Sequence, residues 1–474
     1  MTSDDREDRI RSSKGRQQDW TGKRVVVLGL ARQGKALVRY FVERGANVVV
    51  SDRMPAEALK HATEEFRNLP VDFELGGHPP TLLNAANLLC LSGGVPADLP
   101  LAQQAREQGI PLSNDAQLFI ENCPATVIGI TGSAGKTTTT TLVGRMASAE
   151  FRDRERKVWV GGNIGRPLLN DLPQMKSKDL VVMELSSFQL ELMDVSPQIA
   201  AILNVTPNHL DRHKTMAAYT AAKAHILQHQ TGNDRAVLGR DDEIAWSLRD
   251  QVRGRLISFG WNPPQGDGAY LAGDTIRLRL DGRDTALCPA GIVELRGAHN
   301  LLNVIAACAI AAAAGISPQA MQTGVRGFKG VEHRLEFVRR VAGVDWYNDS
   351  IATAPERAIA AIRSFDEPLV LLSGGRDKDL SWDAYARLVC KRVRHLILFG
   401  EAVEKIAAAV EKQRGGDCKV QVEICGDLEQ AVAAAARVAA VGDVVLLAPG
   451  GTSYDAFKDF TERGEKFREL VNSL

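Results

Sequence analysis

The chain has 474 residues, enough for about three domains of ordinary size. It carries 58 Lys and Arg against 58 Asp and Glu, so its formal net charge is +0. This balance argues against a protein held on nucleic acid, or on an anionic membrane surface, by bulk charge. Apolar residues make up 45% of the chain, which is ordinary for globular domains and excludes wholesale disorder.

The sequence also argues against export and membrane insertion. No stretch approaches the roughly 20 apolar residues that a spanning helix needs. Residues 1–20 are mostly polar and charged, which predicts a disordered tail rather than a signal peptide. The seven cysteines form no CxxC pair, so we expect no disulfide framework. A reducing cytoplasm is the expected location.

The N-terminal region, residues 21–123, alternates apolar strands with helices. Strands are expected at Arg24–Leu28, Asn47–Val50, Asn87–Leu91 and Ile110–Leu112. Such alternation predicts a parallel sheet covered on both faces. Asp52 follows the second strand, 23 residues after Gly29, about where a Rossmann-like domain holds a ribose. An ordinary strand–turn–helix is the alternative for this segment.

The remaining chain predicts two further α/β domains, residues 124–330 and 331–474. Central strands are expected at Ala125–Ile130, Leu180–Met183 and Ile199–Asn204, followed by a hairpin at Asp281-Gly282 and an Ala-rich helix over Asn300–Ala314. C-terminal strands are expected at Leu369–Leu372, His395–Phe399 and Val444–Leu447, between helices at 382–392, 401–413 and 427–440. The expected fold is therefore a Rossmann-like N-terminal domain, a P-loop ATPase-like central domain with a mostly parallel sheet, and a Rossmann-like C-terminal domain.

The most informative segment follows the strand at Ala125–Ile130. Its residues are Thr131-Gly132-Ser133-Ala134-Gly135-Lys136-Thr137-Thr138. A strand, a glycine-rich turn and a helix place several backbone N–H groups and the positive end of a helix dipole at one point, which suits a polyphosphate. Lys136 would reach the β- and γ-phosphates, and the Thr137 hydroxyl would coordinate Mg²⁺. A plain tight turn is the alternative.

Carboxylate and histidine candidates for the metal follow two later strands. Glu184 ends the strand at Leu180–Met183, where open parallel sheets place ligands, and His209 follows the next strand. The histidine pairs His209/His213 and His225/His229 lack the glutamate of a zinc HExxH motif. We therefore expect His213, His225 and His229 to be solvated helix residues.

Several motifs together resemble the Mur ligases, the ATP-dependent amide-forming enzymes that build the peptidoglycan stem peptide. They occur in family order over roughly residues 22–474, and they are Gly129–Thr138, Gly162–Gly165, Met183–Leu190, Asn204–Arg212, Tyr219–Lys223, Gly297–Asn303 and Glu332–Glu336. Within the family the chain most resembles the glutamate-adding branch. Three segments carry that likeness: Val27–Gly34 with Asp52-Arg53, Trp346–Ser350, and Ala448–Gly464.

The resemblance implies roles for many residues. The metal ligands would be Thr137, Glu184, His209 and a carbamylated Lys223, and Lys136, Glu184, His209 and Lys223 would serve catalysis. ATP would contact Gly132–Thr138, Asn300, Asn303, Arg334 and Asp349. The UDP-substrate would contact Ala31, Arg32, Gln33, Asp52, Arg53 and Asn163. The amino acid would contact Thr353, Lys378, Ser453 and Phe460, and His333 would lie at the hinge between domains.

The implied activity is ATP-dependent addition of D-glutamate to UDP-N-acetylmuramoyl-L-alanine through an acyl phosphate, with ATP and two Mg²⁺ ions, by a monomer. Three positions depart from the pattern: Ala134 replaces Asn, Asn208 replaces Asp or Glu, and Ile351 replaces Lys. The last removes a cation expected near the substrates, so addition of L-glutamate remains an alternative. A P-loop nucleotide switch without ligase activity is the alternative from another class.

Overall fold

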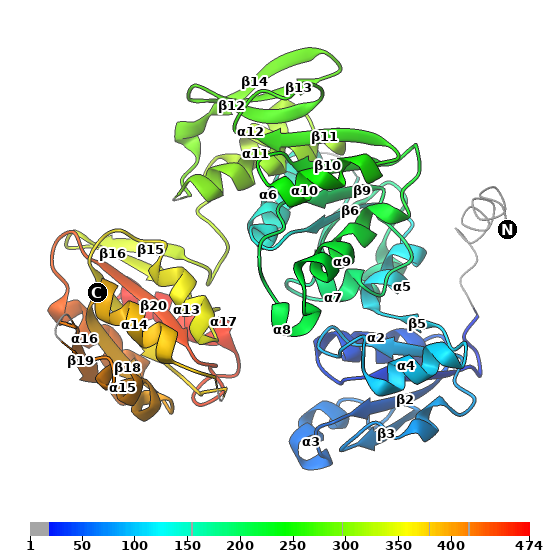
Figure 1. Ribbon diagram of the computed structural model, residues 1–474, viewed down its shortest axis with the longest axis horizontal. Helices are drawn as coiled ribbons and strands as arrows, with labels where there is room; N and C mark the ends of the chain where they lie inside the picture. Colours follow the sequence, from blue (N-terminus) through cyan, green and yellow to red (C-terminus); the bar gives the residue numbers. More distant parts are fainter. Residues whose placement is uncertain (1–18, 153–154, 296, 379, 416–417) are drawn as a thin grey trace. The chain divides into compact units, whose positions relative to one another are not determined.

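The computed structural model describes residues 19–152, 155–295, 297–378, 380–415 and 418–474 (Figure 1). The chain forms two compact units, Met1–Phe328 and Lys329–Leu474. Of the tail expected over residues 1–20, only Asp19 and Trp20 are described. The Trp20 indole is buried, edge-on against Phe41 at a centroid distance of 4.9 Å.

The first sheet confirms the expected parallel arrangement. Its strands are β1 (Arg24–Leu28), β2 (Asn47–Asp52), β3 (Val71–Leu75), β4 (Leu88–Leu91) and β5 (Leu112–Ser113), in the order β3-β2-β1-β4-β5. Its helices are α2 (Arg32–Val42), α3 (Ala56–Glu64), α4 (Pro100–Glu107) and α5 (Asp115–Asn122). Successive residues of β1 point to opposite faces, so Val25 and Val27 enter one core and Val26 and Leu28 another. The fourth expected strand begins at Leu112 rather than Ile110.

The second sheet has nine strands in the order β14-β13-β12-β11-β10-β9-β6-β8-β7. They are β6 (Thr126–Thr131), β7 (Val158–Gly162), β8 (Leu180–Glu184), β9 (Ile199–Ile202), β10 (Arg235–Gly239), β11 (Arg255–Gly260), β12 (Gly268–Ala272), β13 (Thr275–Leu280) and β14 (Arg283–Pro289). Only the pairs β12–β13 and β13–β14 are antiparallel. The expected hairpin joins β13 to β14, with Asp281 at φ 51° and Gly282 at φ 73° as a tight hairpin turn requires.

Seven helices are described around this sheet. They are α6 (Lys136–Glu150), α7 (Ser187–Leu190), α8 (Leu210–His213), α9 (Met216–Gln228), α10 (Glu243–Ser247), α11 (Ala298–Ala313) and α12 (Pro318–Val325). The Ala-rich helix α11 is buried from Val304 to Ala313, and Gly315 follows it at φ 74°. None of the helices in the described ranges is long and apolar enough to cross a membrane.

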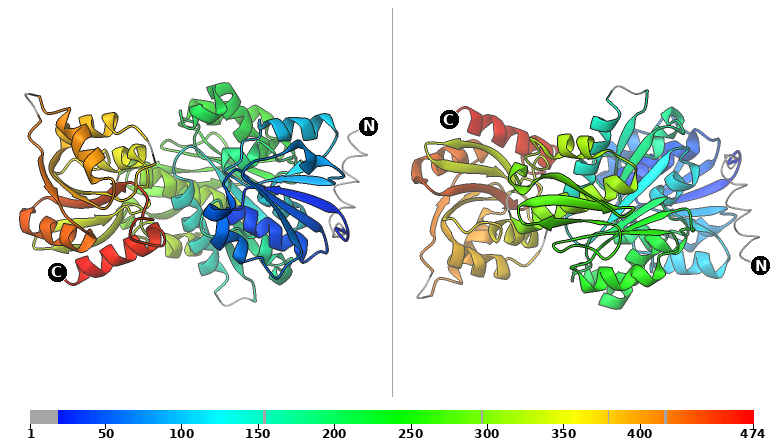
Figure 2. Two further views of the ribbon diagram at one scale, coloured as in Figure 1. Left: turned by 90° about the horizontal axis from the view of Figure 1, so that it is seen from below. Right: turned by 90° about the horizontal axis from the view of Figure 1, so that it is seen from above.

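The C-terminal unit is a doubly covered sheet in the order β15-β16-β20-β17-β18-β19. Its strands are β15 (Glu336–Val341), β16 (Val344–Asn348), β17 (Leu369–Gly374), β18 (Val393–Phe399), β19 (Gln421–Ile424) and β20 (Val444–Gly450). Its helices are α13 (Pro355–Ile362), α14 (Asp383–Arg392), α15 (Val403–Glu411), α16 (Leu428–Val438) and α17 (Phe460–Asn472). One core holds side chains of α13, α14 and α15, and the other holds those of α16 and α17. The helices of this unit accordingly lie on both faces of its sheet (Figure 2).

One cysteine pair is bonded, although the sequence predicts no disulfide framework. Cys390, at the end of α14, is bonded to Cys418, which precedes β19. The two positions are 28 residues apart in the sequence, so no short-range motif marks them. The two cysteines meet because both pack against the core that β18 shares with α14.

A buried carboxylate lies in the network that joins α5 to α7. The Asn114 side chain caps α5 and donates to the Gln189 carbonyl at 2.8 Å, while the Gln189 amide donates to Asp115 at 3.3 Å. Burial raises the pKa of Asp115 to about 6, and the Gln189 hydrogen bond, backbone donors and Arg32 oppose this shift. Because the folded pKa exceeds the unfolded one, ionisation of Asp115 favours the unfolded chain.

We therefore predict that Asp115 lowers the free energy of unfolding as pH rises from about 4 through about 6, by at most about 3 kcal/mol. Asp115→Asn should remove this component, so the stability gain of the variant over wild type should grow between pH 4.5 and 7.5, roughly. Urea unfolding at several pH values measures the difference. Asp98→Asn, at an exposed position of the same region, is the control. A pH-independent difference for Asp115→Asn would contradict the prediction.

Candidate active site

The predicted phosphate-binding segment has the expected strand–loop–helix form. β6 ends at Thr131, the loop runs through Gly132 and Gly135, and α6 begins at Lys136. Gly135 precedes the helix at φ 80°, a left-handed conformation that glycine adopts without a steric penalty. The first turn of α6 therefore directs its backbone N–H groups and its dipole toward the loop. Thr137 is buried in this turn, and Thr138 is half-buried.

Asn204, which follows β9, holds the loop in place. Its backbone carbonyl accepts a hydrogen bond from the Ser133 N–H at 3.0 Å, and its side chain exchanges two with Ala134, at 2.9 and 3.2 Å. The Ser133 hydroxyl donates to the Thr206 carbonyl at 2.9 Å and meets the Tyr219 hydroxyl at 3.0 Å. The sequence indicated Asn204 only as part of a motif, because its partners lie about 70 residues away.

Two amides of α11 lie at the other side of the loop. Asn303 donates to the Asn300 side chain at 3.2 Å. A Cβ atom at Gly135 would come within 2.2 Å of the Asn303 Oδ1 atom. The structure thus brings together Asn300 and Asn303, two of the residues predicted to contact ATP, and places Asn303 directly against the glycine-rich loop.

A buried carboxylate marks the metal side of the site. Glu184 ends β8 and is 2% exposed. The Thr137 hydroxyl donates to one of its oxygens at 2.9 Å, and the Asn163 amide donates to the other at 2.9 Å. A hydroxyl and a carboxylate side by side at a phosphate-binding loop are the hard oxygen donors that Mg²⁺ takes, together with phosphate oxygens. These residues fit a bound Mg²⁺.

Two lysines flank Glu184. The Lys136 ammonium donates to the Gly132 and Ser133 carbonyls, at 2.8 and 3.3 Å. Lys223, on α9, is 1% exposed, with its Nζ atom 3.5 Å from the Thr131 hydroxyl and 4.6 Å from the centre of the Tyr219 ring. Burial, and secondarily the Lys136 charge, lower the pKa of Lys223 to about 7, against the opposing effect of Glu184. A large fraction of Lys223 is therefore a neutral amine near neutral pH.

His209 and His213 differ in their exposure to solvent. His209 is exposed, at φ 53° before α8, and its ring lies 5.1 Å from that of Phe188. His213 was expected to be solvated, and this is wrong, because its ring is buried against Phe188 and bonded to the Ser187 hydroxyl at 2.9 Å. Within the described residues, no group of three or more His, Cys, Asp or Glu side chains forms a metal cage.

Five of the six residues predicted for the UDP-substrate lie around the turns after β1 and β2, and the sixth, Asn163, follows β7. Asp52 accepts the Leu30 N–H at 2.9 Å and the Met54 N–H at 3.0 Å, and Gln33 accepts the Gly93 N–H at 3.1 Å. Arg32 donates to the Gly165 carbonyl and, at 3.4 Å, to that of Asn163. Ala31 precedes α2, and Arg53 is exposed. Through Asn163, these turns are linked to the Glu184 carboxylate.

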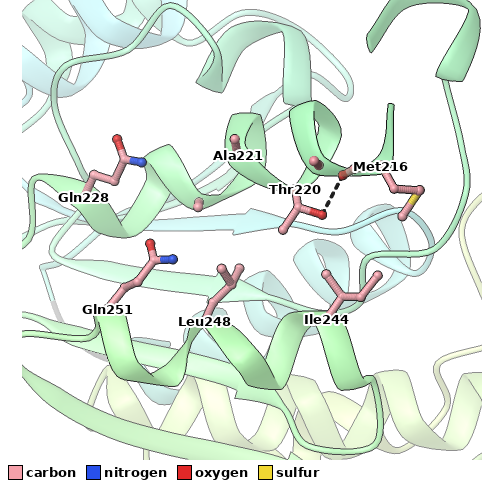
Figure 3. A pocket seen from close by; sticks show the side chains of 9 residues that line it. Met216, Thr220, Ala221, Gln228, Ile244, Leu248 and Gln251 are labelled. Carbon is pink, nitrogen blue, oxygen red and sulfur yellow. Dashed lines mark hydrogen bonds between the residues drawn. The ribbon is translucent and has the colours of Figure 1, made fainter. Parts of the chain in front are cut away.

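A separate groove of about 480 Å³ lies between α9 and α10 (Figure 3). It is lined by Met216, Ala217, Thr220, Ala221, Ala224, Gln228, Ile244, Leu248 and Gln251. Lys223 is not among these residues, because it points from another face of α9. The groove is therefore distinct from the phosphate-binding loop.

The predicted residues Asp349, Thr353, Lys378, Ser453 and Phe460 follow the carboxyl ends of β16, β17 and β20. Burial raises the pKa of Asp349 to about 6, although the Leu335 N–H donates to it at 2.9 Å and Arg334 and Arg357 lie nearby. Thr353 is half-buried, Ser453 is buried and Lys378 is exposed. The Phe460 carbonyl, at the start of α17, accepts from the Ser350 hydroxyl at 2.8 Å.

His333 is buried, and burial lowers its pKa. The Asn348 amide donates to its Nδ1 atom at 3.0 Å, which favours the neutral ring with the proton on Nε2. Arg334 is half-buried, and its Nε atom has no hydrogen-bond partner among the described residues.

Arg463 is a structural residue of this unit that the sequence did not single out. Its fully buried guanidinium donates to the Ser350 hydroxyl at 3.0 Å, the Ser350 carbonyl at 2.9 Å and the Gly451 carbonyl at 3.2 Å. It thereby holds the loops after β16 and β20 together. Its spacing from Ser350, 113 residues, explains why no local pattern reveals it.

The fold and site define a multidomain α/β protein with a glycine-rich loop at the start of a helix and a buried carboxylate beside it, an arrangement that suits a Mg²⁺–nucleotide complex. Family models match in three places: "Mur ligase MurD-like, N-terminal domain" over residues 23–114, "Mur ligase middle domain" over 130–311, and "Mur ligase, glutamate ligase domain" over 333–451.

Relatives that match over nearly their whole length indicate the same family. The UDP-N-acetylmuramoylalanine–D-glutamate ligases of Acetivibrio thermocellus and Symbiobacterium thermophilum are 37% and 41% identical to the chain, covering 95% of it and 97% and 98% of their own lengths. The chain belongs to the Mur ligase family. The UDP-N-acetylmuramate–alanine ligase of Thermotoga maritima shares its fold, with a TM-score of 0.53 at 18% identity over 95% of this chain and 99% of that one.

We predict that Gly135→Ala weakens nucleotide binding by about tenfold or more, because the new methyl group displaces the Asn303 amide and strains the loop. Isothermal titration with a non-hydrolysable ATP analogue and Mg²⁺ measures the dissociation constant. Gly273→Ala is the control, since Gly273 is also left-handed, at φ 58°, but has nothing within 4 Å of an added Cβ. Equal affinities of Gly135→Ala and wild type would rule out this role for the loop.

Proposed function

We propose that the protein joins D-glutamate to UDP-N-acetylmuramoyl-L-alanine at the expense of ATP. Its relatives in Acetivibrio thermocellus and Symbiobacterium thermophilum are UDP-N-acetylmuramoylalanine–D-glutamate ligases. The observation that carries the chemistry is the Thr137–Glu184 pair at 2.9 Å beside Lys136. It supports binding of a Mg²⁺–nucleotide complex, with Thr137 and Glu184 as protein ligands.

The reaction begins with a carboxylate, whose negative charge repels an attacking amine. Transfer of the γ-phosphoryl group to one carboxylate oxygen breaks the bond to ADP and gives an acyl phosphate. The glutamate amine then attacks the acyl carbon, loses a proton, and phosphate leaves with that oxygen. Lys136 and the helix N-terminus of α6 stabilise the charge on the transferring phosphoryl oxygens. Bound Mg²⁺ supplies further positive charge at the same oxygens.

Lys223 is proposed to act as a carbamate. Only a neutral amine reacts with CO₂, and burial already lowers the pKa of Lys223 to about 7. The product is an oxygen-bearing anion, which removes the repulsion between the two lysines and adds hard donors for a second Mg²⁺. His209 is the proposed partner of this second ion.

The remaining assignments are proposals of the same kind. Residues 21–123 would bind the UDP-substrate, through Arg32, Gln33, Asp52 and their neighbours. Residues 124–330 would bind ATP, and residues 331–474 the amino acid, with Arg334 and Asp349 on the nucleotide and His333 at the hinge. A monomer in the cytoplasm is the proposed state, since free nucleotide-linked substrates are met there.

We predict that the purified protein, with UDP-N-acetylmuramoyl-L-alanine, ATP and Mg²⁺, forms an amide with D-glutamate and little or none with L-glutamate. Mass spectrometry of the product and coupled ADP release measure the two reactions. Product formed only with L-glutamate would instead support the alternative raised by Ile351. ADP release independent of both acceptor and amino acid would contradict ligase activity and favour a nucleotide switch.

Lys223→Ala should lower kcat by at least about 100-fold, because the carbamate and its metal ion are lost together. Added acetate should restore part of the activity by supplying a carboxylate in the space vacated. A ¹³C-carbamate resonance after incubation with labelled bicarbonate should be present in wild type and absent in the variant. Lys136→Ala is the control, since acetate cannot replace its positive charge. Full activity of Lys223→Ala would remove Lys223 from the site.

A further inference from the structure

The loop after β16, residues 349–354, is held by backbone hydrogen bonds to two other segments. The Ile351 N–H donates to the His333 carbonyl at 3.1 Å, and the Gly450 N–H donates to the Ala352 carbonyl at 2.7 Å. The loop therefore has a defined position at the carboxyl edge of the sheet, where α/β folds place their ligands. Ile351 itself brings no charge to this edge.

The positively charged side chain of Arg357, from the next helix α13, contacts the backbone of Ile351. The Ile351 carbonyl accepts from the Thr353 N–H at 2.8 Å and from the Arg357 Nη1 atom at 3.4 Å. Arg357 is the third residue of α13, which begins at Pro355. Its guanidinium thus lies at the backbone of residue 351 while remaining exposed to solvent.

A purely structural role does not account for this position. Arg357 lies in the first turn of α13, where the helix dipole disfavours a positive charge. Among the residues that the structure describes, no carboxylate lies within ion-pair distance of Arg357, and Asp349 is a more distant negative charge. Its one hydrogen bond goes to a neutral carbonyl, at a distance near the upper limit for such a bond.

The side chains near Arg357 include two further cations, Arg334 and Lys378. Although both residues keep exposed surface, partial burial and the Arg334 charge lower the pKa of Arg357, which Asp349 opposes, and partial burial and the Arg357 charge lower the pKa of Lys378. These mutual effects place Arg334 and Arg357 near the Asp349 carboxylate, and Lys378 near Arg357. Three cations and one anion leave two positive charges among these described side chains, which suits a ligand with two carboxylates.

We propose that Arg357 binds a carboxylate of the incoming amino acid and supplies from α13 the cation that Ile351 does not provide. The guanidinium can take a carboxylate in a two-point geometry, which a lysine cannot. This inference rests on the proposed function, because it names the group that recognises glutamate. It adds a specificity-determining residue to the amino-acid side of the site.

The test compares Arg357→Ala and Arg357→Lys with Arg363→Ala, which removes an exposed cation from the end of the same helix. Arg357→Ala should raise KM for D-glutamate about tenfold or more, and Arg357→Lys less, while KM for ATP changes less than about twofold. Discrimination against D-glutamine should fall in Arg357→Ala. Arg363→Ala should match wild type.

A second variant separates ligand binding from folding. Adding Ile351→Lys to Arg357→Ala returns a cation to the same point of the loop, and it should recover part of the affinity for D-glutamate. Thermal unfolding of each variant checks that the fold is intact. An unchanged KM for D-glutamate in Arg357→Ala, or a rise confined to KM for ATP, would overturn the inference. No amide product from the wild-type protein would instead refute the proposed function.

Discussion

The candidate site depends on the buried carboxylate of Glu184. An ionised group that is 2% exposed must be met by donors or cations, and here the Thr137 hydroxyl and the Asn163 amide each donate to one oxygen. These two bonds tie β8 to the first turn of α6 and to the segment after β7. The Asn163 carbonyl also accepts a hydrogen bond from Arg32, in the first turn of α2. The Glu184 carboxylate is thereby connected to the segment that follows β1.

Several central strands of the three sheets could be predicted because they are continuous apolar runs, as in Val25–Leu28 and Leu369–Leu372. The interior strands β10, β11, β12 and β16 were not predicted. The strands β3, β7, β15 and β19 were not predicted either, and each of them is a sheet edge. An edge strand is covered on fewer sides, so it alternates or mixes polar residues, as Val71–Leu75 and Glu336–Val341 do. Their apolar signal is therefore too weak to separate from that of a loop.

A similar limit applies to the site. Gly132–Thr138 and Glu184 could be predicted because strand-end position and residue type together carry the information. A neighbour that modifies their chemistry comes from far along the chain, since Lys223 meets Thr131 across 92 residues. In the C-terminal unit, Arg463 likewise meets Ser350 across 113 residues. The lowered pKa of Lys223 follows from burial and from the nearby Lys136, and neither is visible in a linear sequence. The Cys390–Cys418 bond was missed for the same reason.

The hydrogen bonds of Asn204 affect how readily the loop can receive a nucleotide. A glycine-rich loop has many conformations when it is unsupported, and fixing each residue costs about 1–2 kcal/mol of conformational entropy. Here Asn204 holds Ser133 and Ala134, through their N–H groups and one carbonyl, with hydrogen bonds that the protein makes to itself. The ordering cost is therefore met during folding rather than during association. As a result, more of the attraction between the polyphosphate and the loop remains available as binding affinity.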